Sequence, residues 1–324
     1  MKYIEYLNGT IKELVANQEK LFIFGQNIAA GSCLSGLTRG LKVGRGSLVV
    51  NTPNSENTLC GIGFGAMMSG ANAIFFMKQL DFLFLGIDYL VNTYNIVRRT
   101  APQASFTIFP VIVDSGYEGP QASSNNLSDF CSMANVQGYT LNGKTDIQEI
   151  LKTHLIEPGF RIISPSQRLF KSELIECDAV DRSEARTIFQ YGQGDDVTVV
   201  CFNFSLPQGL ELTRQLHAAG LKVDLFSVSA AFAIDWQRIC LSVQKTKNFV
   251  IIDDSKSING LWQGLLNAVH DQCVLEKKII VKRQLSGYYP RPHADQLDIN
   301  YQSIVEQLSR SAKNTREQEH ILRK

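Results

Sequence analysis

The sequence carries almost no excess charge of either sign, since 32 basic residues stand against 31 acidic ones in a chain of 324 residues. A formal net charge of +1 provides no global field that would attract nucleic acid or an anionic membrane. Long apolar runs are missing as well, and none approaches the ~20 residues that a membrane-spanning helix needs. The first residues, MKYIEYLNGTIKELV, contain acids where a signal peptide needs a continuous apolar region. We therefore expect a cytoplasmic protein that binds neither nucleic acid nor membranes.

Patterns that bind metal ions are also missing. The seven cysteines are scattered without a C-x-x-C pair, and the five histidines form no pair at metal-binding spacing. Most of the cysteines stand among apolar residues, which is typical of buried free thiols. We therefore expect no metal site that this chain builds alone.

The chain is long enough for two domains, each with a core of its own. In its first part, apolar spacing predicts helices at about 2–17, 56–69 and 81–99. Runs rich in β-branched and aromatic residues predict strands at LFIFG, SLVVNTP, NAIFFM and SFTIFPVIVD. This alternation is typical of a parallel sheet that is covered on both faces.

A charged and polar segment, residues 176–196, is the best candidate for an interdomain linker. Four further strands are predicted after it, at VTVVCFNF, LKVDLFSV, NFVIIDD and KIIVKR, with helical patterns at 206–219, 235–246 and 260–273 between them. The sequence therefore predicts an α/β protein with two doubly wound domains, residues 1–180 and 190–324. A nucleotide-binding α/β protein is a weak alternative, because no strand is followed by G-x-G-x-x-G or by a P-loop motif.

Two motifs in the first part resemble a known family. TPNSENTLCGIGFGAMMSG is similar to the family pattern T-P-[IN]-S-E followed by a Gly/Ala-rich helix, and DFLFLGIDYLVN is similar to its D-F-x-x-x-x-x-D-x-x-x-N helix. Weaker matches are ISPS at 163–166 and the segment that begins GDDVTVVCFNF. Together they resemble the β subunit of the thiamine-diphosphate-dependent 2-oxoacid dehydrogenases. The same region corresponds to the pyrimidine-binding and C-terminal domains of transketolase and deoxyxylulose-phosphate synthase.

Glu56 is the residue to which the resemblance gives a chemical role. Thiamine diphosphate reacts through its thiazolium carbon, and its own 4-amino group removes the proton there when the opposite pyrimidine nitrogen is protonated. A glutamate in an apolar pocket can share that proton, because burial disfavours its charged form. Spacing alone favours a different interpretation, a first-turn acid that complements a helix dipole. The resemblance favours the catalytic and cofactor-binding role.

The sequence departs from the family at the residue that stacks on the pyrimidine ring. An aromatic residue is common where the segment FFMKQLDF of this chain has Lys78 or Gln79. Phe76 and Phe82 are the remaining aromatic candidates for the cofactor site. Plain core packing is the alternative for each of them.

A second departure lies in GYEGPQASS, residues 116–124, where dehydrogenase β subunits commonly carry G-P-Q-H-S. Ala122 stands at the position of that histidine and cannot transfer a proton. Gln121 and Ser123 remain as hydrogen-bonding groups near the site, with a structural role as the alternative. This departure favours transketolase-like transfer over lipoyl-linked dehydrogenation.

A third departure is an extra segment, residues 138–159, with a short helix predicted at 146–155. His154 in that helix is predicted to be a solvated residue. The segment either shapes contacts with substrate or partner, or adds surface without a function.

The cofactor's diphosphate requires Mg²⁺ held by a G-D-G motif and a later N-N pair, and no G-D-G occurs in this chain. The resemblance therefore implies an α subunit that carries these motifs, and a heterotetramer in which β chains also associate with each other. It implies transfer of a ketol or acyl unit from a ketose or 2-oxoacid. The alternatives are the β subunit of a 2-oxoacid dehydrogenase first component and a non-catalytic regulatory homologue.

Overall fold

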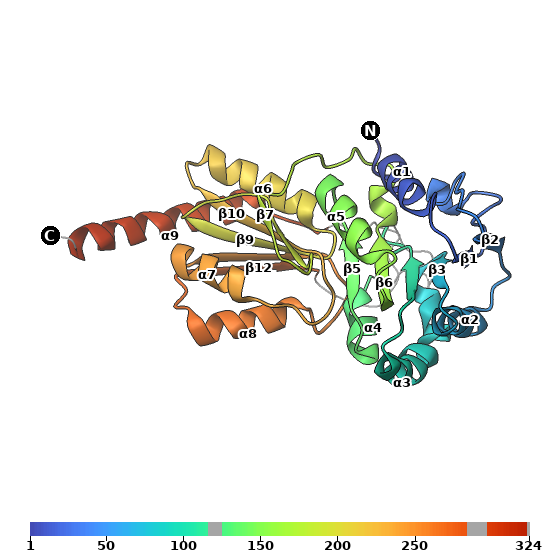
Figure 1. Ribbon diagram of the computed structural model, residues 1–324. Helices are drawn as coiled ribbons and strands as arrows, with labels where there is room; N and C mark the ends of the chain where they lie inside the picture. The colour runs from blue at the N-terminus through green and yellow to red at the C-terminus, as the bar shows by residue number, and fades with distance from the viewer. Residues whose placement is uncertain (116–124, 284–296, 323–324) are drawn as a thin grey trace, which may run out of the picture. The chain divides into compact units, whose positions relative to one another are not determined.

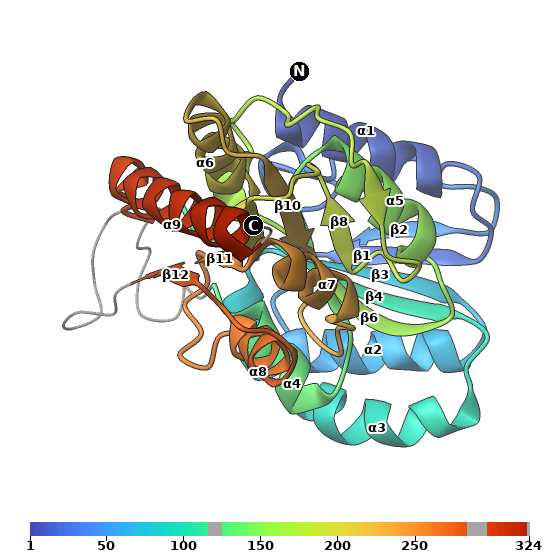
Figure 2. The same ribbon diagram turned by 90° about the vertical axis from the view of Figure 1, so that its left-hand side faces the viewer.

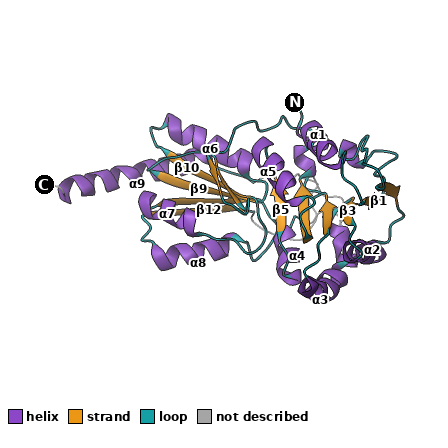
Figure 3. Cartoon of the chain, viewed as in Figure 1, coloured by secondary structure: helices purple, strands orange, loops and turns teal. Residues whose placement is uncertain are grey.

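The structure is a computed structural model that describes residues 1–115, 125–283 and 297–322, and the side chains as far as residue 311. It divides into two compact units. The first contains Met1–Cys177 and Ala230–Phe232, and the second contains Asp178–Ser229 and the described residues after Phe232. Each unit is an α/β layer structure with its strands inside and its helices outside (Figures 1 and 3).

The first unit contains a six-stranded sheet in the order β2-β1-β3-β4-β6-β5, and every pairing in it is parallel. Its strands are β1 (Leu21–Gly25), β2 (Leu48–Asn51), β3 (Asn72–Met77), β4 (Ser105–Pro110), β5 (Gly138–Leu141) and β6 (Gly159–Pro165). Its α-helices are α1 (Tyr3–Val15), α2 (Glu56–Met68), α3 (Tyr94–Val97), α4 (Leu127–Ala134) and α5 (Lys144–His154). Helices α1 and α5 lie on one face of the sheet, and α2 and α3 lie on the other (Figure 2). The predicted doubly wound arrangement is confirmed for this unit.

The second unit contains another six-stranded sheet, in the order β12-β11-β9-β10-β8-β7. Its strands are β7 (Asp181–Arg182), β8 (Ile188–Gln190), β9 (Val197–Phe202), β10 (Val223–Val228), β11 (Asn248–Asp253) and β12 (Lys277–Lys282). Its helices are α6 (Leu206–Ala218), α7 (Gln237–Thr246), α8 (Trp262–Gln272) and α9 (Tyr301–Leu322). Strands β9 to β12 pair in parallel, whereas β8 is antiparallel to both of its neighbours. The predicted α/β class is confirmed here too.

The segment predicted as a linker, residues 176–196, instead supplies strands β7 and β8 to the second sheet. Ile188 and Phe189 of β8 are fully buried. They pair with Val228 and Ser227 of β10. The linker prediction was wrong because it used the overall composition of the segment, in which charged residues outnumber the two apolar residues of this short strand.

The single helix predicted at 81–99 is wrong, because the structure has four short pieces there. They are the 3₁₀-helix η2 (Leu80–Leu85), the π-helix η3 (Tyr89–Thr93), α3, and the 3₁₀-helix η4 (Arg98–Thr100). Gly86 ends the first piece, and its backbone N–H donates to the carbonyl of Leu83 at 3.0 Å. Glycine, asparagine and threonine are weak helix formers, so the local sequence offers little resistance to these breaks.

The extra segment, residues 138–159, forms edge strand β5 and helix α5 and so belongs to the first sheet. His154 is buried, which contradicts its prediction as a solvated residue. Its ring stacks on Tyr139 with centroids 4.4 Å apart, and its Nδ1 lies 2.6 Å from a carboxylate oxygen of Glu157. The helix thus presents His154 to the sheet.

The predicted free thiols are confirmed, since all seven cysteines are free and Cys60, Cys131, Cys201 and Cys240 are buried. Across the described ranges, no helix has both the length and the apolar character that crossing a membrane requires.

Candidate functional site

The candidate site is built at the carboxyl edge of the first sheet, where parallel strands end together. Glu56 is the first residue of α2 and follows β2 after a short loop. The backbone N–H of Thr52 in this loop donates to the carbonyl of Gly25, the last residue of β1, at 3.0 Å. Asn51 at the end of β2 accepts with its side-chain oxygen the N–H groups of Ile28 and Ala29 in the loop after β1, each at 2.9 Å. The position of the carboxylate is therefore set by the sheet.

The side chain of Glu56 is unusual for an acid because the residue is only 7% exposed. Among the residues that the structure describes, its carboxylate makes no hydrogen bond and no ion pair. Its oxygens are not among the fully buried side-chain atoms that lack a partner in the described residues, so they reach the surface and are accessible to a ligand that brings a donor. The site thus fits a ring nitrogen that shares a proton with Glu56.

After Glu56, helix α2 buries Leu59 and Cys60, whereas Asn57 and Thr58 of its first turn are polar and exposed. Cys60 stands one turn further along the helix and is fully buried. Burial, and after it the charge of Glu56, raises the pKa of this thiol to about 12, so it stays protonated at neutral pH. The Cys60 thiol therefore adds a neutral S–H group, and no charge, on this side of Glu56.

Two glycines of α2, Gly61 and Gly63, face other elements at close range. A Cβ on Gly63 would stand 2.2 Å from the ring of Phe106 in β4, and a Cβ on Gly61 would stand 2.8 Å from the ring of Tyr89 in η3. Real Cβ atoms do not approach this closely, so a side chain at Gly63 would collide with the fully buried ring of Phe106, whereas at Gly61 the end of the half-buried Tyr89 side chain would have to shift. Helix α2 is thereby seated directly on β4 and η3.

The three candidates for the pyrimidine contact occupy different environments. Phe76 is fully buried in β3, and its ring packs on Phe109 with centroids 5.1 Å apart. Gln79 follows the carboxyl end of β3 and is 7% exposed, while Phe82 in η2 is half-buried. Gln79 is therefore at the correct edge of the sheet, whereas Phe76 has the contacts of a core residue. Gln121 and Ser123, together with Ala122, lie outside the described residues.

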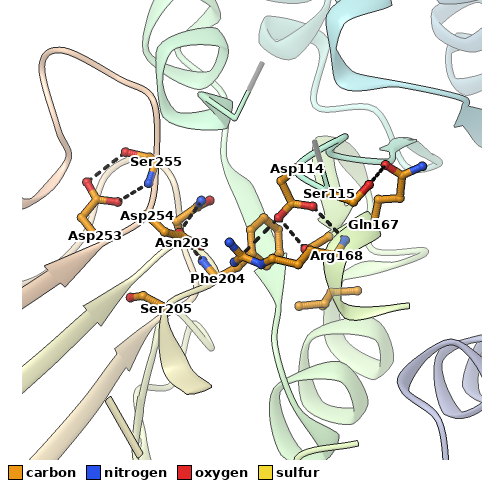
Figure 4. A network of polar contacts seen from close by, with 12 residues as sticks. Asp114, Ser115, Gln167, Arg168, Asn203, Phe204, Ser205, Asp253, Asp254 and Ser255 are labelled. Carbon is orange, nitrogen blue, oxygen red and sulfur yellow. Dashed lines mark hydrogen bonds and ion pairs between the residues drawn. The ribbon is translucent and has the colours of Figure 1, made fainter. Parts of the chain in front are cut away.

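The sequence reading missed a second acid at this edge, Asp114, which is fully buried beyond the end of β4 (Figure 4). Its carboxylate accepts the hydroxyl of Ser166 at 2.5 Å and the backbone N–H of Arg168 at 2.9 Å. The guanidinium of Arg168 lies 3.8 Å away. The available signal was an acid directly after the buried run FTIFPVIV. These contacts join the carboxyl ends of β4 and β6.

The second unit has its own polar cluster at the carboxyl ends of β9 and β11, also drawn in Figure 4. Asp254 accepts the side-chain amide of Asn203 at 2.8 Å and the backbone N–H of Phe204 at 3.0 Å. Asp253 accepts the backbone N–H and the hydroxyl of Ser255, both at 2.9 Å, and burial raises its pKa to about 6. After β9 the chain continues to β10 on one side of the sheet, and after β11 it continues to β12 on the other side. The hydrogen bonds of Asp253 and Asp254 lie at the edge where these two connections begin.

Comparison with known proteins supports the resemblance drawn from the sequence. Residues 190–303 match the family model of the transketolase C-terminal domain. The chain is 24% identical over 318 residues to the mitochondrial pyruvate dehydrogenase E1 component subunit beta of Dictyostelium discoideum, covering 92% of this chain and 87% of that one. It is 21% identical over 292 residues to the 2-oxoisovalerate dehydrogenase subunit beta of Bacillus subtilis, covering 87% and 88% of the two chains.

A solved structure described as a split gene transketolase, inactive beta4 tetramer, has the same fold. It superimposes with a TM-score of 0.62 and covers 96% of both chains at 13% sequence identity. This likeness confirms the predicted two-domain fold class, and the family model and the two relatives confirm the resemblance.

Proposed function

We propose that this chain is the pyrimidine-side subunit of a split, thiamine-diphosphate-dependent enzyme of the transketolase type. The observation that carries the proposal is Glu56, a buried carboxylate without a protein partner in the described residues, at the carboxyl edge of a parallel sheet. Similarity to dehydrogenase β subunits over 92% of the chain supports it. The domains that we propose are a pyrimidine-binding domain, 1–180, and a transketolase C-terminal-like domain, 190–324.

When bound, thiamine diphosphate would supply a nucleophilic carbon for cleaving or forming a bond next to a carbonyl group. The role of Glu56 is to hold a proton at the pyrimidine nitrogen. Leu59 and Cys60, which follow Glu56 in α2, are buried and would shield one side of that proton from water. Gln79 is the group that we propose for polar contact with the ring, and Phe82 is the aromatic candidate that remains partly accessible.

Two reactions fit this site. Ala122 in place of a histidine supports ketol or acyl transfer between carbonyl compounds. The alternative is that the chain is the β subunit of a 2-oxoacid dehydrogenase first component, which is what the names of two relatives describe. Assays of the assembled enzyme with a ketose donor and an aldose acceptor, and with a 2-oxoacid and an artificial electron acceptor, distinguish them. The cytoplasm is the compartment that we propose.

We further propose that an α subunit with the G-D-G and N-N motifs holds the diphosphate and Mg²⁺. The purified chain alone is then expected to bind thiamine diphosphate weakly, and addition of the α subunit with Mg²⁺ to give tight binding. Titration calorimetry checks this, with a run without Mg²⁺ as its control. Tight, magnesium-dependent binding by this chain alone would overturn the split arrangement.

Association between β chains is a separate expectation. Light scattering of the mixed α and β chains should give the mass of two copies of each, with the β chains in contact. A mass that corresponds to one α and one β chain would contradict the proposed heterotetramer, although it would leave the role of Glu56 intact.

A further inference from the structure

Gly86 closes the 3₁₀-helix η2 against the first turn of α2. A Cβ on Gly86 would stand 2.6 Å from Sγ of Cys60 and 3.4 Å from the backbone oxygen of Glu56. The backbone of Gly86 has φ −110° and ψ 1°, a conformation that other residues also adopt. Glycine is therefore required here because of space and not because of backbone geometry.

Cys60 is the side chain on which Gly86 rests. It is fully buried and stands one turn after Glu56 in α2. A thiol that remains protonated adds volume to this contact without adding charge beside the carboxylate. The contact thus joins the segment that carries Gln79 and Phe82 to the residue that we propose for proton sharing.

We propose that Cys60 and Gly86 form a seat that fixes the first turn of α2 and so orients the Glu56 carboxylate. In this Cys60–Gly86 seat, Cys60 acts as a positioning residue. The inference rests on the proposed function only in the final step, where orientation of Glu56 matters for cofactor chemistry. The packing itself is testable on the chain alone.

A double-mutant cycle in the full chain tests the contact. Gly86→Ala is expected to lower the melting temperature by roughly 2–6 °C, because a methyl group is forced onto a buried thiol. Cys60→Ala removes the obstructing sulfur atom. Gly86→Ala should therefore lower the melting temperature clearly less in a chain that also carries Cys60→Ala. Losses that simply add would overturn the seat. If Gly86→Ala alone does not fold, a folded double variant supports the seat, and failure of both to fold overturns it.

The second measurement is amide hydrogen exchange of the peptide that covers the first two turns of α2. Exchange should be faster by at least about tenfold in Gly86→Ala and should return toward the wild-type rate in the double variant. Cys60→Ser, which keeps the size of the side chain, should leave it unchanged. Unaltered exchange in Gly86→Ala would overturn the claim that the seat holds this turn.

A second glycine that lies against a buried cysteine, Gly138 against Cys131, provides a matched control. A Cβ on Gly138 in β5 would stand 2.4 Å from Sγ of Cys131, a buried thiol in α4. The cycle of Gly138→Ala with Cys131→Ala should show coupling in melting temperature without a change in α2 exchange. This control separates a general packing defect from an effect on the Glu56 turn.

With the α subunit present, Gly86→Ala should slow proton exchange at the thiazolium carbon, whereas its affinity for thiamine diphosphate should change less than the exchange rate. The double variant should recover the rate, and the Gly138 and Cys131 variants should keep it. The positioning role is overturned if the melting temperatures show that Gly86 and Cys60 are coupled but proton exchange at the thiazolium carbon does not change. Failure of the proposed function gives a different result. In that case Glu56→Gln would also show wild-type proton exchange at the thiazolium carbon.

Discussion

Replacing Glu56 by glutamine is expected to slow proton exchange at the thiazolium carbon of bound thiamine diphosphate by about 10²–10⁴-fold in the assembled enzyme. An amide has nearly the same shape as the carboxylate but cannot hold the shared proton. Because Glu56 has no hydrogen bond to lose among the described residues, the fold should change little. Exchange of deuterium at that carbon, followed by NMR after rapid quenching, measures the effect directly.

Glu5 provides the matched control for this change. It is also an acid in the first turn of its helix, but it is exposed, and its carboxylate accepts the backbone N–H of Lys2 at 3.0 Å. Glu5→Gln should leave the exchange rate unchanged. If Glu56→Gln behaves in the same way, Glu56 is only a helix-start acid, and the main support for the catalytic proposal disappears.

The regular parts of the fold could be predicted because their signals are local. Buried β-branched and aromatic runs, such as Val197–Phe202 and Asn248–Asp253, are strands in the structure close to where the sequence placed them. The helix with small residues after Asn51 also begins at Glu56, as predicted. In each case one segment contains both the apolar pattern and its ends.

The parts that the sequence did not predict depend on contacts between distant segments. Strand β8 is only three residues long, so its pairing with β10 and β7 decides its conformation more than its own composition does. His154 has the neighbours of a surface helix in sequence, yet it stacks on Tyr139 of another element. The carboxylate of Asp114 is fixed by Ser166 and Arg168, more than fifty residues further along the chain. Periodicity in a short window contains no information about such partners.

Within the site, the sequence predicts only the residues that belong to the motif around Glu56. The position of Glu56 at the start of α2 follows from the sequence pattern, but the close approach of Gly86 to Cys60 does not. That approach exists because the predicted helix at 81–99 breaks after Leu85 and turns its backbone toward α2. A reading that expects a continuous helix cannot place Gly86 there.

Gly63→Ala is expected to lower the free energy of unfolding of the first unit by about 1–3 kcal/mol, although alanine is the better helix former by about 1 kcal/mol. The new methyl group would meet the ring of Phe106 at 2.2 Å. That ring cannot move aside, since it is fully buried and packs against Phe64 and Phe160 with centroids 5.0 and 5.2 Å away. Calorimetric melting of the chain measures the loss.

Gly65→Ala in the same helix tests whether the loss comes from the contact with Phe106 and not from changing a helical glycine. No atom lies within 4 Å of a Cβ at Gly65, which is exposed. Helix propensity then acts alone, and the variant should gain about 0.5–1 kcal/mol. The two positions lie about half a turn apart. A loss of unfolding free energy at Gly63 together with a gain at Gly65 would show that α2 packs on β4 through Gly63. Since Glu56 begins this helix, Gly63→Ala should also slow cofactor proton exchange, whereas Gly65→Ala should not. A Gly63→Ala chain that melts at or above the wild-type temperature would contradict this packing of α2.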